Sequence, residues 1–141
     1  MTIDRYAVRA LVLSPEREVL LIDFRPEPQR QVWLTPGGGI QPGETSEQAL
    51  RRELDEELGL TEFTIGPLVA RRIRSYFTGS AADGGTRRRA KQHEEFYVIH
   101  QPRFAPRMSD PIEILKVAGF RWWSLPELHT TRELVVPRTL A

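Results

Sequence analysis

The sequence contains no cysteine, which excludes disulfide bonds and thiolate metal sites from this chain. It also carries almost no net charge, because 20 Lys and Arg residues offset 19 Asp and Glu residues and leave +1. That balance provides no long-range field to attract nucleic acid or an acidic membrane surface. No apolar run approaches the length that crosses a bilayer. We therefore expect no membrane association and no stable nucleic-acid partner.

A secretory leader is also not expected, because the first residues, MTIDR, lack a basic segment followed by an apolar one. Together with the missing cysteines, this favours a cytoplasmic location. The 141 residues are predicted to form a single domain, 1–141, which is long enough to bury a hydrophobic core.

Strands and helices are expected to alternate along the chain. Short apolar, β-branched segments predict strands at 6–13, 19–24, 31–34, 95–100 and 120–123, with a weaker alternation over 63–77. A helix is predicted to begin after Thr45 or Ser46 and to end at Leu58, and residues 125–128 are expected to form the turn at the start of a second helix. The Gly- and Arg-rich residues 78–92 are expected to form a loop. This order favours an α/β or α+β fold with a helix packed on a sheet.

The predicted central helix has a signal at each end. Thr45 and Gln48 have the spacing of a capping box, and Gly59 is suited to the position just past the last turn. Apolar side chains recur every fourth residue, which indicates a buried stripe along the helix. They are Leu50, Leu54 and Leu58.

Three carboxylates share one face of this helix, beside the apolar stripe. At about 100° per residue, Glu57 lies about 40° to one side of Glu53 and Glu56 lies about 60° to the other. Like charges at this spacing destabilise a helix, and Arg52 offsets only part of the repulsion. A hard divalent cation would offset the rest. Because the cluster contains neither His nor Cys, Mg²⁺ or Mn²⁺ is favoured over zinc.

A run of three glycines, Gly37, Gly38 and Gly39, precedes the acidic helix. Glycine lets the backbone approach a ligand closely and adopt positive φ. Each feature has an ordinary alternative, since acidic helices are commonly solvated faces and glycine runs are commonly plain turns. The combination is rarer than its parts, and it favours a binding site formed by the turn and the helix together.

The spacing of these residues resembles the Nudix box. Gly38 is followed after five residues by Glu44, and after seven more by Arg52-Glu53-Leu54, then by Glu56-Glu57 and Gly59-Leu60. Every fixed position of that motif is filled between residues 38 and 60. The later segment WWSLPEL, at 122–128, is also similar to a common Nudix segment.

The Nudix resemblance implies an α/β/α sandwich around a mixed sheet and hydrolysis of a nucleoside diphosphate linked to another group. By that likeness, Glu53, Glu56 and Glu57 hold Mg²⁺ or Mn²⁺, with the carbonyl of Gly37 as a further ligand. Arg52 orients these glutamates, and Glu44 supports the end of the loop. Glu53 is our first choice for the base that takes a proton from the attacking water.

Four further site residues are expected around the box. Gly38 and Gly39 are predicted to meet the substrate, and Arg25 to meet its phosphates. Tyr76 lies near the position where diadenosine-polyphosphate hydrolases of this family place a tyrosine, with packing in a strand as the alternative. An additional acid outside the box is expected at Glu94 or Glu95, and since these point to opposite faces of a strand, only one can aim at the helix. We favour Glu94. The cationic residues 87–91 are a further phosphate-binding candidate, with a solvated loop as the alternative.

The sequence leaves the substrate open. Nucleoside triphosphates, dinucleoside polyphosphates, ADP-ribose and nucleotide sugars all fit a pyrophosphohydrolase of this family. The alternative function is a catalytically silent nucleotide-binding or sensor module, which the intact box disfavours. The sequence leaves the oligomeric state open, and a homodimer is one candidate, since members of the family it resembles are often dimers and exposed strand edges can pair.

Overall fold

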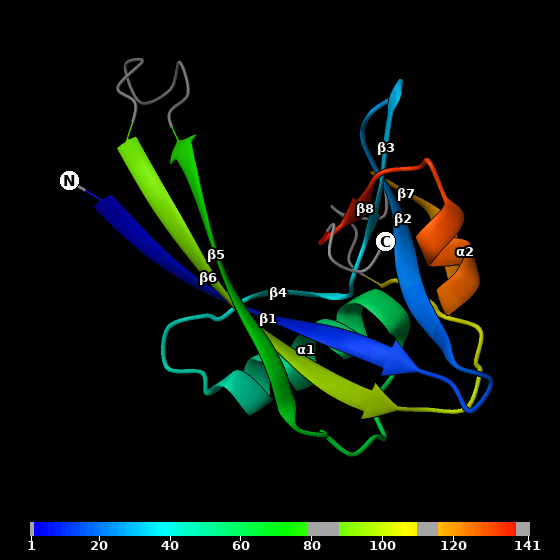
Figure 1. Ribbon diagram of the computed structural model, residues 1–141. Helices are drawn as coiled ribbons and strands as arrows, with labels where there is room; N and C mark the ends of the chain where they lie inside the picture. The colour runs from blue at the N-terminus through cyan, green and yellow to red at the C-terminus, as the bar shows by residue number, and fades with distance from the viewer. Residues whose placement is uncertain (1, 79–87, 110–115, 138–141) are drawn as a thin grey trace.

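The computed structural model describes residues 2–78, 88–109 and 116–137, and these form one eight-stranded sheet with two helices (Figure 1). The strands are β1 (Thr2–Leu13), β2 (Glu18–Glu27), β3 (Arg30–Leu34), β4 (Gly37–Gly39), β5 (Leu68–Thr78), β6 (Arg88–His100), β7 (Val117–Ser124) and β8 (Val135–Val136). The helices are α1 (Ser46–Leu58) and α2 (Leu125–Thr130). Neither helix is long and apolar enough to cross a membrane.

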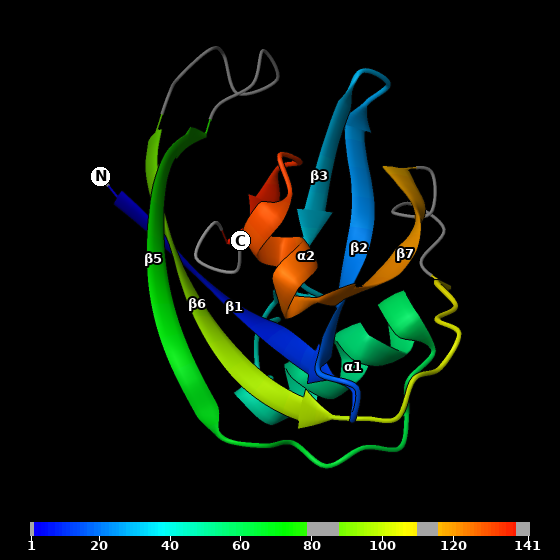
Figure 2. The same cartoon turned by 45° about the vertical axis from the view of Figure 1, so that its right-hand side comes forward.

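The sheet is mixed and divides into two arms. Its order is β5-β6-β1-β2-β3-β8, with β4 paired to β1 and β7 to β2. The pairs β1–β6 and β3–β8 are parallel and the others are antiparallel. Strands β1 and β2 pair only where Leu13 faces Val19. From that junction the first arm (β1, β4, β5, β6) and the second arm (β2, β3, β7, β8) diverge (Figures 1 and 2).

Helix α1 begins and ends as its sequence predicts. The Thr45 side chain accepts a hydrogen bond from the Gln48 N–H, and the Gln48 side chain accepts one from the Thr45 N–H, which completes the capping box. Gly59 adopts the left-handed conformation at φ 69° and donates to the last turn. These bonds satisfy backbone groups that a helix terminus otherwise leaves unpaired.

The two helices cover opposite faces of the sheet. Leu50, Leu54 and Leu58 of α1 are buried in one apolar cluster that includes Leu20 of β2. Leu21, the next residue of β2, lies in a second cluster with Leu128 of α2. Because successive strand residues point to opposite faces, α1 and α2 enclose β2 between them. This arrangement confirms the predicted α/β/α sandwich.

Three predictions of local structure were incomplete. Residues 88–92 are not loop, because β6 starts at Arg88 and pairs with β1 and β5 from there. The glycine run is a short strand, β4, and not only a turn. Strand β1 starts at Thr2, four residues before the apolar segment that predicted it. In all three cases the neighbouring strand supplies hydrogen-bond partners that the local sequence does not reveal. Residues 79–87 of the predicted loop lie outside the described residues.

Candidate active site

The glycines of β4 bring backbone against β1 and against the acidic helix. Gly37 has φ 137°, and a Cβ there would lie 2.1 Å from the Val8 carbonyl oxygen. A Cβ on Gly38 would lie 2.5 Å from Oε1 of Glu53. The expected close approach therefore exists, and its immediate partners are a neighbouring strand and a box carboxylate. Only glycine fits both positions without displacement.

The carboxylate of Glu57 joins α1 to β4. Its Oε2 accepts a hydrogen bond of 3.1 Å from the Gly37 N–H, and the residue is only 5% exposed. Glu53 is partly buried against Gly38, while Glu56 lies nearer to solvent. The carboxylates of the predicted set thus extend from a buried contact at β4 to the rim of the helix.

Arg52 links three parts of this region: Glu44 in the loop, the carboxylates of α1, and the backbone of β4. Its Nε and Nη2 donate to both oxygens of Glu44 at 2.8 and 2.9 Å, and Nη1 donates to Oε1 of Glu53 at 2.9 Å. Weaker contact to Glu56 spans 3.4 Å, and Nη2 also donates to the Gly39 carbonyl at 2.9 Å. The hydrogen bond to Glu44 raises the pKa of Arg52 above its ordinary value. Reciprocally, Arg52 and then the Gln41 N–H lower the pKa of Glu44.

The donor atoms of this region fit a hard divalent cation. They are carboxylate and carbonyl oxygens, the ligands that Mg²⁺ and Mn²⁺ prefer. Within the described ranges, no three Asp, Glu, His or Cys side chains converge closely enough to hold a metal ion. Arg52 donates hydrogen bonds to Glu53 and Glu56, and the Gly37 N–H donates one to Glu57. A carboxylate offers about four acceptor positions, so these hydrogen bonds are compatible with its also binding a cation.

A pocket of about 440 Å³ opens beside Glu57 and takes side chains from both arms. Its cationic lining consists of Arg9, Arg30, Arg72 and Arg74. Its acidic lining is Glu57 and Glu94, and the backbone of Gly37 and Gly38 closes one side. The remaining wall is mainly apolar, with Ile22, Phe24, Val32, Leu34, Val117, Leu134 and Val136. Such a pocket suits a ligand that has phosphate groups and an apolar or flat body.

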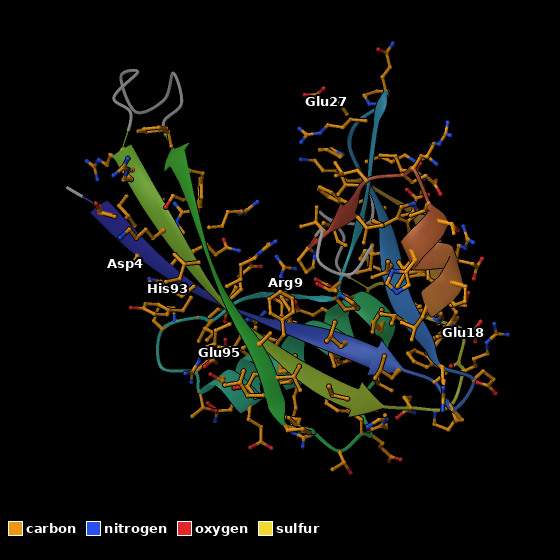
Figure 3. All side chains as sticks on the ribbon, in the orientation of Figure 1. Asp4, Arg9, Glu18, Glu27, His93 and Glu95 are labelled. Atoms are coloured by element: carbon orange, nitrogen blue, oxygen red, sulfur yellow. The ribbon has the colours of Figure 1, made fainter. Side chains whose placement is uncertain are left out.

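Glu94 is buried in this pocket, with 2% of its surface exposed. Arg72 donates to its Oε1 from Nε at 2.8 Å and from Nη2 at 2.5 Å. Arg9, on β1, donates from Nε to Oε2 of Glu94 at 3.0 Å (Figure 3). Burial raises the pKa of Glu94, but the two guanidinium groups outweigh burial and hold the pKa below its ordinary value.

Glu95 faces the other side of β6, toward the beginning of α1 (Figure 3). It accepts hydrogen bonds from the Ser46 hydroxyl at 2.8 Å and the Tyr97 hydroxyl at 3.1 Å. The residue that aims at the helix is thus Glu95, contrary to the reasoning that favoured Glu94. Glu94 points to the opposite face of β6, and there it lines the same pocket as Glu57.

Three of the four predicted substrate contacts, Gly39, Arg25 and Tyr76, do not line the pocket. Arg25 is 47% exposed and pairs with Asp23 through two hydrogen bonds of 3.2 Å, which raise the pKa of Arg25. Tyr76 shares a strand with Arg72 and Arg74, and its ring lies 5.3 Å from the Arg74 guanidinium. It stands farther along β5 than the residues that line the pocket. Of the cationic cluster, residues 88–91 lie in β6, and Arg87 is outside the described residues.

Arg9 and Arg72 were missed from the sequence, although a signal existed. Arg9 interrupts the apolar segment YAVRALVL, where a buried strand would carry another aliphatic residue. Arg72 sits among other arginines in LVARRIRSYFT and has no distinguishing neighbour. Arg72 of β5 pairs with Glu94 of β6, and Ala7 of β1 pairs with Glu94 from the other side. Only the pairing of the strands reveals these neighbours.

Comparison with known proteins places the chain in a family. The NUDIX domain family matches residues 4–139. The chain is 47% identical over 55 residues to the human 8-oxo-dGDP phosphatase NUDT18, covering 39% of this chain and 17% of that protein. It is 41% identical over 73 residues to the nucleoside triphosphatase NudI of Enterobacter sp. (strain 638), covering 48% of this chain and 43% of that protein. The chain therefore spans less than half the length of these curated relatives.

Solved structures share the fold along nearly the whole chain. A MutT NUDIX hydrolase from Burkholderia pseudomallei has a TM-score of 0.61 at 23% identity, covering 97% of this chain and 94% of that one. The dihydroneopterin triphosphate pyrophosphohydrolase of E. coli has a TM-score of 0.61 at 19% identity, covering 93% and 90%. At these identities the likeness concerns the fold alone. With the family match over residues 4–139 and the box residues gathered at β4 and α1, the chain belongs to the NUDIX domain family.

Proposed function

We propose that this protein is a metal-dependent pyrophosphohydrolase, which splits a diphosphate bond in a nucleoside diphosphate linked to another group. The observation that carries the proposal is the junction of α1 and β4 at the pocket. There Glu57 bonds to Gly37, and Glu53 lies against Gly38, beside a space lined by arginines. Carboxylates next to a cationic, partly apolar pocket suit a metal-bound phosphate ester.

We assign the metal to Glu53, Glu56, Glu57 and the Gly37 carbonyl, with Mg²⁺ or Mn²⁺ as the ion. When bound, the ion neutralises phosphate oxygens and lowers the pKa of a coordinated water. Arg52 orients Glu53 through the hydrogen bond at Nη1, and Glu44 holds Arg52 from the other side. We assign Glu53 as the base that would accept the proton of the attacking water, and its carboxylate lies next to Gly38.

A nucleotide-type small molecule is the substrate that we infer. The relatives bear the names 8-oxo-dGDP phosphatase, nucleoside triphosphatase and, for the protein of Erwinia tasmaniensis, RNA pyrophosphohydrolase. The last matches at 55% identity over 40 residues, covering 28% of this chain and 23% of that protein. Each name refers to a nucleotide or RNA and to hydrolysis at its phosphate groups, which supports that substrate class and not one particular compound.

A substrate panel tests this function. Purified protein is incubated with (deoxy)nucleoside triphosphates, dinucleoside polyphosphates, ADP-ribose and nucleotide sugars, with Mg²⁺, with Mn²⁺ or with EDTA. We expect metal-dependent release of phosphate or nucleoside monophosphate from at least one compound. Tight binding of one ligand without turnover would instead favour the nucleotide-sensor alternative.

A further inference from the structure

The pocket holds a buried carboxylate between two arginines, and this group is not part of the Nudix box. Glu94 receives three hydrogen bonds, two from Arg72 to one oxygen and one from Arg9 to the other. Arg9 also donates from Nη1 to the carbonyls of Gly37 at 3.2 Å and Thr35 at 3.4 Å. We call Arg9, Glu94 and Arg72 the arginine clamp.

The carboxylate of the arginine clamp is poorly suited to accept a proton or bind a cation. Both of its oxygens are engaged by guanidinium groups, and these lower its pKa. A metal ion approaching Glu94 would meet the two positive charges that surround it. A base in this position would also need to be released from both arginines before it reached a water molecule.

The arginines, in contrast, keep unused hydrogen-bond donors beside the pocket. Among contacts with the described residues, Arg9 Nη2 and Arg72 Nη1 have no acceptor. Two guanidinium groups against one carboxylate leave a net positive charge, next to the Gly37 and Gly38 backbone that lines the same pocket. A rigid pair of guanidinium groups is the arrangement that binds phosphate oxygens through several charge-assisted hydrogen bonds.

We propose that Arg9 and Arg72 bind phosphate oxygens of the substrate and that Glu94 is a positioning residue that fixes both guanidinium groups. Substrates with phosphate groups in this pocket are favoured over those that place an uncharged sugar there. The inference rests on the proposed function for the identity of the ligand, but the binding of a phosphate compound can be measured without turnover. Glu94 therefore acts through Arg9 and Arg72, and not on the reacting water.

Binding of methylenediphosphonate, a diphosphate that cannot be hydrolysed at its bridge, tests the two arginines directly. Affinities are measured by titration calorimetry with EDTA and with Mg²⁺. We expect Arg72→Met to weaken binding about tenfold or more in both conditions. Arg71→Met is the matched control, since Arg71 is the preceding residue, is 72% exposed and faces the opposite side of β5. It should change the affinity less than about twofold.

Arg72→Lys supplements the methionine variant, because it keeps the charge and removes only the forked geometry. Circular dichroism and melting curves establish that each variant is folded. No binding to the wild-type protein, or equal losses in Arg71→Met and Arg72→Met, would overturn the proposal. A loss limited to the Arg72 variants, with no nucleotide turned over by any form, would leave the clamp standing and refute only the hydrolase function.

Glu94→Asp tests the positioning role without changing the charge. Shortening the side chain withdraws the carboxylate from Arg9 and Arg72, so we expect KM to rise about threefold to tenfold while kcat falls less. In the Arg72→Met background the same substitution should add less than about twofold, because the residue through which it acts is gone. A fall in kcat of about 100-fold at unchanged KM would identify Glu94 as a base or metal ligand and refute the positioning role.

Discussion

At the scale of single residues, the proposed hydrolysis depends on Glu53. Glu53→Gln keeps the size of the side chain but removes the proton acceptor, so we expect kcat to fall about 10²-fold to 10⁴-fold. Asp55→Asn is the control, since Asp55 is exposed on the same helix. It should keep kcat within about twofold. Steady-state kinetics with Mg²⁺ on the best substrate of the panel measures both, and equal losses would contradict a specific role for Glu53.

The glycine strand gives a prediction of stability that needs no substrate. Gly37→Ala puts a Cβ 2.1 Å from the Val8 carbonyl at a positive φ, so we expect a loss of about 2 kcal/mol or more in the free energy of unfolding. In Gly39→Ala the nearest atom lies 4.0 Å away, and the change should stay within about 0.5 kcal/mol. Urea unfolding compares the two variants. Similar losses at both positions would show that β4 is not packed against β1 as described.

The pKa of Glu44 gives a prediction about pH. Arg52 and the Gln41 N–H lower this pKa in the folded state, below the value of about 4.3 that an unfolded chain would have. The unfolded state therefore binds the proton first, and the stabilising contribution is complete above the unfolded pKa. It is lost as pH falls through the folded pKa. At pH 6 the melting temperature of the wild-type protein should be higher than that of Glu44→Gln. The difference between the two melting temperatures should shrink at about pH 3.

The box residues were predictable one by one because their chemistry is local. The spacing of Glu53, Glu56 and Glu57 already assigns them to one face of α1, and that helix exists with the predicted caps. The different roles of Glu57 and Glu94 could not be predicted from local spacing. One bonds to a glycine N–H 20 positions earlier, and the other to arginines on two different strands. Contacts between distant segments carry no periodic signal.

At the scale of elements, α1 depends on its apolar stripe. Leu54 is fully buried in the cluster beneath β1 and β6, so Leu54→Ala should cost about 2 to 5 kcal/mol of unfolding free energy. Leu125→Ala on α2 is the control, because Leu125 is exposed and its removal should cost less than about 1 kcal/mol. Denaturant titration measures the difference. A small effect at Leu54 would contradict the packing of α1 described above.

Element boundaries were predicted well where capping residues define them and poorly where strand pairing does. The ends of α1 coincide with Thr45 and Gly59, both of which satisfy helix-end hydrogen bonds. Strand β6 starts earlier than its apolar segment because Arg88 and Arg89 are held by pairing with the neighbouring strands. Polar residues that alternate on an extended arm give no apolar period for a sequence analysis to detect.

At the scale of the whole molecule, the sandwich could be anticipated, but the pocket could not. The order of strands and the family resemblance led to a mixed sheet with helices on both faces, as observed. The pocket takes Arg9 and Arg72 from the first arm and Phe24 and Val32 from the second. It lies where β1 and β2 diverge from the junction of Leu13 and Val19, which is a property of sheet geometry and not of any short segment.

The most direct test of the central claim is a measurement of nucleotide hydrolysis across the substrate panel with Mg²⁺, using wild-type protein and the Glu57→Gln variant. Glu57 joins α1 to the Gly37 N–H at the edge of the pocket, so its loss should disrupt the site we assign to the metal. We predict turnover of at least one nucleotide by the wild type, abolished by EDTA and lowered at least about 100-fold by Glu57→Gln. Turnover that survives both EDTA and Glu57→Gln unchanged would contradict the account.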